Sequence, residues 1–262
     1  MANERGAGLK RWISTAGVGL FLVAVVVLGF VALTLQRYNL PDAESAAQSS
    51  QPAAAPAPGG SSTPAAPAAP TRLLILGDSF TAGVGASATD NGWAPQVAEA
   101  LDGPDRIDAV PRTGYVFPGP DSAVDDSFPS RTQRLVSAGD FTPDVVVVQG
   151  GQEDYRGTLL ELDDAVRETV TRLRAAYPQA RIVLFGSTRA FPESRALEPI
   201  NATIAKAAAT VDVPFIDPVA ERWITSKNSA RYISYDLTHP NDAGHAYLAE
   251  RFLEDFRALP TG

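Results

Sequence analysis

The chain has 262 residues, of which 45% are hydrophobic and 20% charged, with a formal net charge of −8 and no cysteine. Disulfides, thiolate nucleophiles, lipid attachment through cysteine and cysteine-rich zinc sites are therefore excluded. With only two histidines and a charge of −9 in residues 71–262, the chain also lacks an HExxH metal site and a basic face for nucleic acid.

Residues 13–35 form a segment of 23 residues without a charge. As a helix it would span about 34 Å, slightly more than the hydrocarbon core of a bilayer. Three basic residues precede it and only Arg37 follows closely, so the positive-inside rule places residues 1–12 in the cytoplasm. A cleaved signal peptide is the alternative, although its apolar region is usually shorter, about 7–15 residues. We expect one N-terminal transmembrane helix, a cell-membrane location and an extracytoplasmic remainder.

Residues 36–70 have the composition of a linker. Between Pro41 and Pro70, 25 of 30 residues are Ala, Pro, Ser or Gly, without apolar periodicity. This composition predicts a disordered tether that reaches up to about 90 Å at roughly 3 Å per residue. Residues 71–262 follow, and their 192 residues suffice for one domain with a core of its own.

Five short apolar runs recur along this domain. Continuous apolar runs are typical of strands covered on both faces, as in a parallel sheet between two layers of helices. The stretches between the runs are helical in pattern. The predicted strands are residues 73–76, 106–110, 145–148, 182–185 and 213–216.

Two helices are indicated most clearly. Apolar residues recur at spacings of three or four from Leu159 to Tyr177, and Pro178 follows as a stop signal. Asn241 can cap a last helix whose apolar face includes Leu248. Strands and helices that alternate in this way predict a three-layer α/β/α sandwich with a mainly parallel sheet. In such sheets ligands bind beyond the carboxyl ends of the strands.

The first candidate site residue is Ser79, which lies directly after the first predicted strand. Gly77 and Asp78 precede it, and Gly83 and Gly85 follow. These glycines permit a sharp strand-to-helix turn that would expose Ser79 at the edge of the sheet. Tight turns use the same residue types for purely structural reasons, so the turn alone does not establish a nucleophile.

The second candidate element is Asp236, three residues before His239. A serine nucleophile needs a base to accept its proton, and the base needs a group that fixes its tautomer and stabilises the imidazolium. Asp236 and His239 can fill these two roles from one turn. The other histidine, His245, is predicted to be a packing or surface residue of the last helix.

At these residues the chain resembles the SGNH (GDSL-type) hydrolase superfamily, over residues 71–262. The Gly-Asp-Ser turn that holds Ser79 matches the family's first block, and Asp236 with His239 matches the DxxH of its last block. The resemblance implies a flavodoxin-like sheet and a Ser-His-Asp triad without metal or cofactor. It also implies that the backbone N–H groups of Ser79 and Gly114 bind the oxyanion.

The third block departs from the family's pattern. After the predicted strand 145–148 the family usually shows Gly-x-Asn-Asp, and the asparagine amide donates to the oxyanion. Here Glu153 occupies the asparagine position and Gln152 precedes it. An ionised carboxylate cannot donate a hydrogen bond, and loss of one oxyanion donor costs about 10²–10³ in rate. Three accounts remain open: Gln152 turns its amide into the oxyanion hole, Glu153 is protonated or pairs with an arginine outside it, or the site is weak or silent.

The sequence thus predicts a membrane-anchored, extracytoplasmic serine esterase that hydrolyses carboxylic esters. Its partners would be the membrane, through the N-terminal helix, and an ester-bearing substrate, for which a cell-envelope glycan or lipid is one option. An acyltransferase acting on such glycans or lipids would use the same residues and is the first alternative. A catalytically weak binding module is the second alternative, and its motivation is Glu153.

Overall fold

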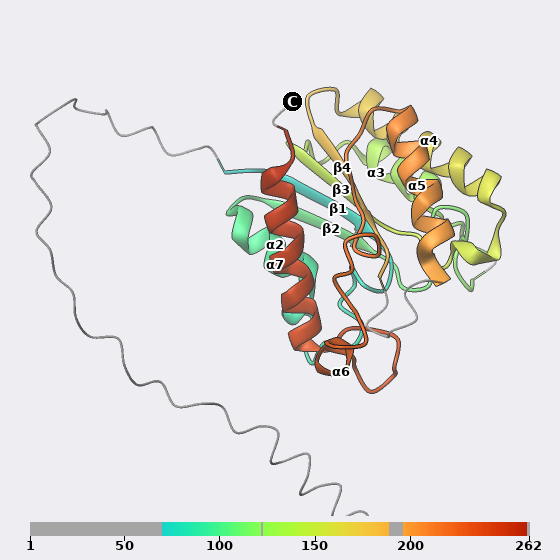
Figure 1. Ribbon diagram of the computed structural model, residues 1–262. Coiled ribbons are helices and arrows are strands. Elements are labelled where there is room, and N and C mark those ends of the chain that lie inside the picture. Colours follow the sequence, from blue (N-terminus) through green and yellow to red (C-terminus); the bar gives the residue numbers. More distant parts are fainter. Residues whose placement is uncertain (1–69, 122, 189–195, 261–262) are drawn as a thin grey trace, which may run out of the picture. The chain divides into compact units, whose positions relative to one another are not determined.

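The computed structural model describes residues 70–121, 123–188 and 196–260 (Figure 1). In this part of the chain, five strands form one parallel sheet with the order β2-β1-β3-β4-β5. This is the flavodoxin-like strand order, and the predicted mainly parallel α/β fold is confirmed. The strands are β1 (Leu73–Gly77), β2 (Asp105–Ala109), β3 (Val145–Gly150), β4 (Arg181–Gly186) and β5 (Phe215–Ile216).

Helices cover both faces of the sheet, so the architecture has three layers (Figure 1). One apolar core lies between the sheet and α2 with α7, and a second lies between the sheet and α3, α4 and α5. Two 3-10 helices, η2 (Thr89–Asn91) and η3 (Asp154–Arg156), lie in the connections. The helices are α2 (Trp93–Leu101), α3 (Phe128–Ala138), α4 (Leu159–Ala176), α5 (Glu198–Thr210), α6 (Ser229–Tyr232) and α7 (Asp242–Ala258).

The central strand β1 shows why the apolar runs are continuous. Leu73 and Ile75 lie in the core with α2 and α7, whereas Leu74 and Leu76 lie in the opposite core. Successive side chains of a strand point to opposite faces, so a strand between two helix layers needs apolar residues at every position. Burial of each such side chain contributes about 1.5–3 kcal/mol.

Side-chain caps fix the start of two helices. Thr158 Oγ1 accepts from the Glu161 N–H, and the Thr158 N–H donates to the Glu161 carboxylate in return, which forms a capping box before α4. The predicted cap of the last helix is confirmed, because Asn241 Oδ1 accepts from the Gly244 N–H at 2.9 Å. This cap sets the position of the loop that carries His239, two residues before it.

The predicted strand boundaries differ most at the fifth strand, which has two residues instead of four. The Val213 N–H donates to the Ala208 carbonyl at 3.1 Å, so residue 213 still completes the end of α5 and cannot pair with β4. The second strand begins and ends one residue earlier than predicted. Local apolar content does not reveal which residues are engaged by a neighbouring helix end.

The predicted membrane segment, residues 13–35, lies outside the described residues, as do residues 36–69 of the predicted linker. Among the helices that the structure describes, none is long and apolar enough to cross a bilayer.

Candidate active site

The candidate site residues follow the carboxyl ends of neighbouring strands. Ser79 comes two residues after β1, Gly114 lies in the connection after β2, and Gln152 and Glu153 come directly after β3. His239 lies in the loop before α7. Because the strands are parallel, these segments meet at one edge of the sheet, where ligands bind in folds of this kind.

Ser79, His239 and Asp236 form a continuous hydrogen-bonded chain, which we call the relay. His239 Nε2 lies 2.9 Å from Ser79 Oγ, and His239 Nδ1 lies 2.6 Å from Asp236 Oδ2. The carboxylate can only accept, so Nδ1 carries the hydrogen of the neutral ring and Nε2 is left to accept a proton from the serine. This is the geometry of a nucleophile, its base and the group that orients the base.

A tight turn holds the Asp236 carboxylate in place. Its Oδ1 accepts from Ser234 Oγ at 2.7 Å and from the N–H groups of Thr238 and His239 at 2.9 Å each. Burial acts to raise the pKa of Asp236, but the bonds from His239, Ser234 and Thr238 outweigh it and hold the pKa below its usual range. The carboxylate is therefore ionised and can stabilise an imidazolium. Leu237 within the turn adopts a φ of +57°, in the left-handed region.

The chain leaves β1 through a single helical turn, in which the Ala82 N–H donates to the Asp78 carbonyl at 3.0 Å. Gly83 and Gly85 then take φ values of +74° and +94°, which side chains with a β-carbon rarely adopt. The predicted strand-to-helix turn is therefore only one turn long, and α2 begins later. Within the described residues the Ser79 N–H has no hydrogen-bond acceptor, so it can donate to a bound group.

Gly85 allows the histidine loop to approach the serine turn. A β-carbon at this position would lie 2.3 Å from the Pro240 carbonyl oxygen and 2.9 Å from His239 Cβ. Real β-carbons do not come so close, so any other residue would displace the loop that carries His239. The sequence shows Gly85 only as part of a glycine-rich turn, and this contact explains why a glycine is needed there.

His245 is fully buried and does not belong to the relay. Its Nε2 lies 3.1 Å from the Val84 carbonyl oxygen, and its Nδ1 accepts from the Trp93 N–H at 3.3 Å. Burial lowers the pKa of His245, which keeps the ring neutral. His245 thus ties the serine turn to the starts of α2 and α7, and the predicted packing role is confirmed.

Asp154 organises the opposite side of the site. Its buried carboxylate accepts from the N–H groups of Tyr115, Val116 and Phe117 at 3.0, 2.7 and 3.3 Å. Burial raises the pKa of Asp154, and the three N–H groups act against this. The carboxylate thereby joins residues 114–117 to residues 152–156, which we call the oxyanion loops. Sequence reasoning missed this role, for which the only signal was the Asp that follows Glu153.

Gly114 is packed against that carboxylate. A β-carbon at position 114 would lie 2.5 Å from Asp154 Oδ1, so the close approach requires glycine. The Gly114 N–H donates to the Phe117 carbonyl at 2.9 Å. In this structure the N–H is therefore engaged within its own loop, and it can reach an oxyanion only if that bond is given up.

Gln152 and Glu153 differ in their partners. Gln152 is 6% exposed, and its buried Oε1 has no hydrogen-bond partner among the residues described. Glu153 Oε2 accepts from Arg156 Nε at 3.1 Å, and the Arg156 guanidinium lies 4.5 Å from the centre of the Phe117 ring. The arginine pair is one of the accounts left open by the sequence. Among the described residues, the Gln152 Oε1 therefore has no hydrogen bond to lose if the amide turns toward a substrate.

Asp78 lies directly before the nucleophile and is fully buried. Its Oδ1 accepts from the Phe80 N–H at 2.9 Å, which stabilises the turn. Burial, the largest effect, raises the pKa of Asp78 to about 7, and the charges of Asp154 and Glu153 add to the rise. Asp78 is therefore a structural hydrogen-bond partner within the serine turn.

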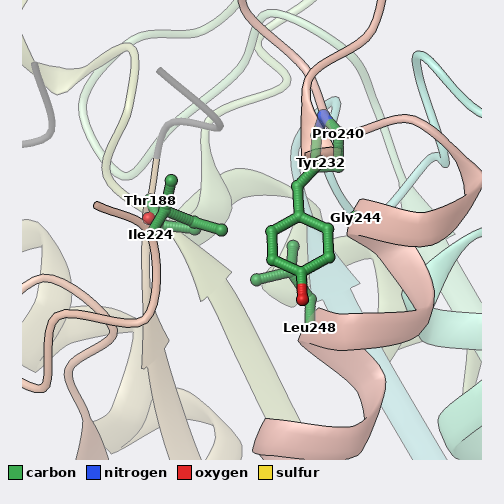
Figure 2. A pocket seen from close by; sticks show the side chains of 6 residues that line it. All are labelled: Thr188, Ile224, Tyr232, Pro240, Gly244 and Leu248. Atoms are coloured by element: carbon green, nitrogen blue, oxygen red, sulfur yellow. The ribbon is translucent and has the colours of Figure 1, made fainter. Parts of the chain in front are cut away.

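A small apolar pocket begins one residue after His239, between the end of β4 and the start of α7 (Figure 2). Its lining side chains leave no room for even a water-sized group, so in this structure it is a shallow gap in the packing and not a substrate pocket. The pocket is lined by Thr188, Ile224, Tyr232, Pro240, Gly244 and Leu248.

Across residues 70–121, 123–188 and 196–260, no group of three His, Cys, Asp or Glu side chains is placed to hold a metal ion.

A serine that is hydrogen-bonded to a histidine and a carboxylate at the edge of a parallel sheet is typical of serine hydrolases. Residues 75–247 match the model of the GDSL-like lipase/acylhydrolase family. The chain belongs to this family, which confirms the resemblance predicted from the sequence. It is accordingly a serine hydrolase that acts on esters.

Known proteins similar to this chain include hydrolases of several kinds. The GDSL lipase Rv0518 of Mycobacterium tuberculosis is 28% identical over 192 residues, which cover 68% of this chain and 78% of that protein. The acetyl xylan esterase Est2A of Butyrivibrio proteoclasticus is 17% identical, with a TM-score of 0.56 over 74% of this chain and 64% of that one. An aryl esterase of M. smegmatis is 18% identical, with a TM-score of 0.54 over 72% of this chain and its own full length. At these identities, the two structures show that the fold is shared.

Proposed function

We propose that this protein is a membrane-anchored, extracytoplasmic serine esterase that hydrolyses carboxylic esters through Ser79, His239 and Asp236. The observation that supports it best is the unbroken relay, with 2.9 Å between Ser79 Oγ and His239 Nε2 and 2.6 Å between His239 Nδ1 and Asp236 Oδ2. Both distances are those of formed hydrogen bonds, so transfer of the serine proton to His239 requires no rearrangement of these side chains.

In the first step, Ser79 Oγ attacks the carbonyl carbon of the ester while its proton passes to His239 Nε2. The tetrahedral intermediate collapses, the bond to the leaving oxygen breaks, and the same proton passes to the leaving alcohol. A water molecule then gives a proton to His239 and attacks the acyl-enzyme, which releases the acid and restores Ser79. Asp236 keeps the ring in the required orientation and stabilises its positive form in both steps.

The negative charge of each tetrahedral intermediate needs hydrogen-bond donors. The Ser79 N–H is one donor, and the Gly114 N–H becomes a second when it leaves the Phe117 carbonyl. The Gln152 amide is the third, because the Glu153 carboxylate is bound to an arginine. Of these three donors, the Gly114 N–H must change its partner on substrate binding.

The anchored location rests on the distribution of charge and apolar residues in the first 70 residues. Residues 13–35 are uncharged and long enough to span a bilayer, and most nearby basic residues precede them. Residues 36–70 then provide a tether for the domain. Transfer of the acyl group to a hydroxyl of a cell-envelope glycan or lipid uses the same acyl-enzyme and stays a prediction, as does a weak binding module.

The test is the hydrolysis of p-nitrophenyl acetate by the full-length chain, compared with the Ser79→Ala variant. The wild type should release p-nitrophenol, and removal of the nucleophile should lower kcat by at least about 10³-fold, as in other enzymes that use such a triad. Equal rates in the two proteins would refute the proposal. Thermal unfolding of both proteins checks that the variant is folded.

A further inference from the structure

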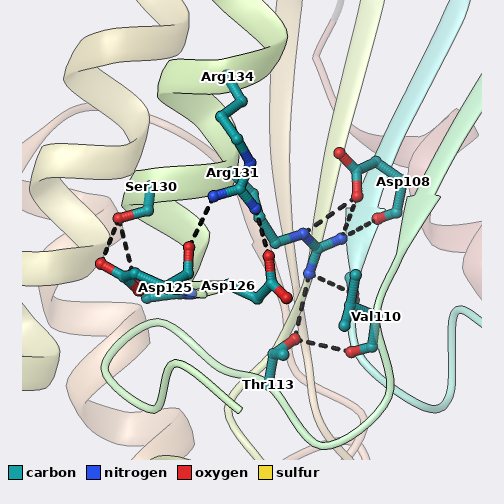
Figure 3. Close-up of polar contacts among 10 residues, drawn as sticks. Asp108, Val110, Thr113, Asp125, Asp126, Ser130, Arg131 and Arg134 are labelled. Carbon is teal, nitrogen blue, oxygen red and sulfur yellow. Dashed lines mark hydrogen bonds and ion pairs between the residues drawn. The ribbon is translucent and has the colours of Figure 1, made fainter. Parts of the chain in front are cut away.

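Arg131, in the first turns of α3, is a buried cation outside the relay. Its side chain is 1% exposed, and all three of its nitrogens donate hydrogen bonds (Figure 3). Nε and Nη2 bind Asp108 Oδ1 at 3.1 and 2.5 Å, and Nη2 also binds the Asp108 carbonyl oxygen. Nη1 binds the Gly77 carbonyl oxygen at 2.9 Å and Thr113 Oγ1 at 3.1 Å. One guanidinium group therefore joins three separate segments.

These segments are the ones that carry the nucleophile and the oxyanion loop. Gly77 is the last residue of β1, two residues before Ser79, and Thr113 directly precedes Gly114. The Nη1 atom alone contacts both segments. Arg131 consequently fixes the distance between the serine turn and the loop that is expected to bind the oxyanion.

Two further bonds make this arrangement rigid. Thr113 Oγ1 donates to the Val110 carbonyl at 2.7 Å, and the Val110 N–H donates to the Gly77 carbonyl at 3.1 Å. Arg131 closes this ring of hydrogen bonds. Arginine suits the position because its planar group presents donors in fixed directions, whereas lysine has one ammonium nitrogen and cannot reach Asp108, Gly77 and Thr113 together.

We propose that Arg131 is a positioning residue for ester hydrolysis, which holds the nucleophile turn and the Gly114 loop at the separation that the transition state requires. The inference rests on the proposed function of Ser79. Arg131 touches no reacting atom in this scheme. Its effect is on the placement of the Ser79 and Gly114 N–H groups relative to the developing charge.

The experiment compares Arg131→Lys with Arg134→Lys, a matched control one turn later on the same helix. Arg134 Nη1 donates to the Asp125 carbonyl at 2.7 Å, and Nη2 binds the Asp126 carboxylate (Figure 3). Neither partner belongs to the serine turn or the Gly114 loop. The full-length proteins are assayed with p-nitrophenyl acetate, and kcat is calculated per active site titrated with a fluorophosphonate.

We expect Arg131→Lys to lower kcat about 10- to 100-fold. Misplaced N–H donors lose more stabilisation of the transition state than of the bound substrate. KM should stay near the wild-type value, and Arg134→Lys should match the wild type. A kcat per titrated site equal to that of the wild type would overturn the proposal, even with a lower Tm, because it would show a purely structural role. A loss confined to KM would overturn it as well.

A second variant, Thr113→Val, keeps the test decisive if Arg131→Lys does not fold. It removes the hydroxyl that joins Arg131 to the Gly114 loop and leaves the bonds to Asp108 and Gly77. We expect kcat to fall about 5-fold, which corresponds to the net free energy of one hydrogen bond, again without a matching change in KM. An unchanged kcat would contradict the proposal. If the proposed function is wrong, the wild type will hydrolyse the ester no faster than Ser79→Ala does. The positioning role of Arg131 is then wrong as well.

Discussion

The two sides of the active site are assembled to different degrees. In the relay, Ser79, His239 and Asp236 are already joined by hydrogen bonds of 2.9 and 2.6 Å. In the oxyanion loops, the Gly114 N–H donates to a carbonyl of its own loop, and the Glu153 carboxylate, which the sequence pattern aligns with an amide donor, is paired with Arg156. The hydrogen bonds of the relay are thus already formed, and the Ser79 N–H has no acceptor among the described residues, whereas the Gly114 N–H must give up its present partner before it can donate to an oxyanion.

This difference follows from how each side is built. The relay depends on one short turn, Asp236 to His239, and on one close approach at Gly85. The oxyanion loops depend on buried charged groups that join distant segments, with Asp154 on one side and Arg131 on the other. Changes in the relay should therefore abolish activity, while changes in the oxyanion loops should alter its level.

Apart from removal of the nucleophile itself, the largest effect is expected from Gly85→Ala, which breaks the relay side. The new β-carbon would meet the Pro240 carbonyl oxygen at 2.3 Å, so the loop must move and His239 must leave Ser79. We expect kcat for p-nitrophenyl acetate to fall by at least about 10²-fold, the cost of a displacement of about 1 Å in a catalytic group.

Gly83→Ala is the matched control for this variant. Gly83 also has a positive φ, of +74°, but its β-carbon would meet nothing closer than 3.4 Å. It therefore introduces backbone strain of about 1–2 kcal/mol without moving His239. Its Tm should fall while kcat is retained. Equal kcat values for the two alanine variants would contradict the role assigned to Gly85.

A smaller effect, of opposite sign, is expected from Glu153→Asn on the oxyanion side. The change removes a negative charge from the loop that carries Gln152 and supplies an amide donor in its place. We expect kcat to rise about 10-fold. This is less than the factor of about 10²–10³ by which kcat falls when one oxyanion donor is removed. Steady-state kinetics with p-nitrophenyl acetate measure it.

Asp164→Asn controls for loss of charge alone. Asp164 pairs with Arg167 three residues later, the same spacing as the Glu153–Arg156 pair, but on the exposed surface of α4. Its kcat should equal that of the wild type. If Glu153→Asn leaves kcat unchanged too, then the oxyanion loops do not limit the reaction and the contrast between the two sides is wrong.

The smallest effects concern stability, and two buried groups beside the serine turn, His245 and Asp78, should differ in the sign of their pH dependence. Burial lowers the pKa of His245, so the folded protein resists a proton that the unfolded chain accepts near its usual value of about 6.5. Its contribution to stability is complete above that value and is lost as the pH falls. Burial raises the pKa of Asp78 to about 7, so its contribution is complete below about 3.9 and is lost as the pH rises toward 7.

Thermal unfolding between pH 4 and 8 separates these two contributions. The Tm difference between the wild type and His245→Gln should become smaller as the pH falls below about 6.5, the usual pKa of histidine. Asp78→Asn keeps an acceptor for the Phe80 N–H, and it should gain Tm relative to the wild type as the pH rises. Parallel Tm differences for the two variants across this range would show that these groups are not buried as described.

The strands, the serine turn and the Asp236–His239 pair were predictable because their signals are local, whereas the contact between Ser79 and His239 spans 160 positions and was expected from the chemistry of a triad and from the family resemblance. The continuous apolar runs identify strands covered on both faces, and the Asp236 to His239 spacing fits one turn of chain. Asn241 also marks the start of α7 from sequence alone. Each of these signals lies within a few residues of the feature that it predicts.

The arrangement of the oxyanion side was not predictable in the same way. Asp154 binds residues 115–117, nearly 40 positions earlier, and Arg131 reaches Gly77, 54 positions away. Neither residue stands out in composition or periodicity, since Asp and Arg are common on helix and loop surfaces. Only the folded sheet, which places β1, β2 and β3 side by side, brings these groups together.

Labelling with a fluorophosphonate tests the central claim most directly, because it reports the activated nucleophile whatever the natural substrate is. Reaction at an activated serine displaces fluoride and leaves a phosphonyl group on Oγ, which peptide mass spectrometry can locate. The account predicts one label per chain, on Ser79, and none in the Ser79→Ala variant. A wild-type chain that stays unlabelled, or a label on a residue other than Ser79, would contradict it.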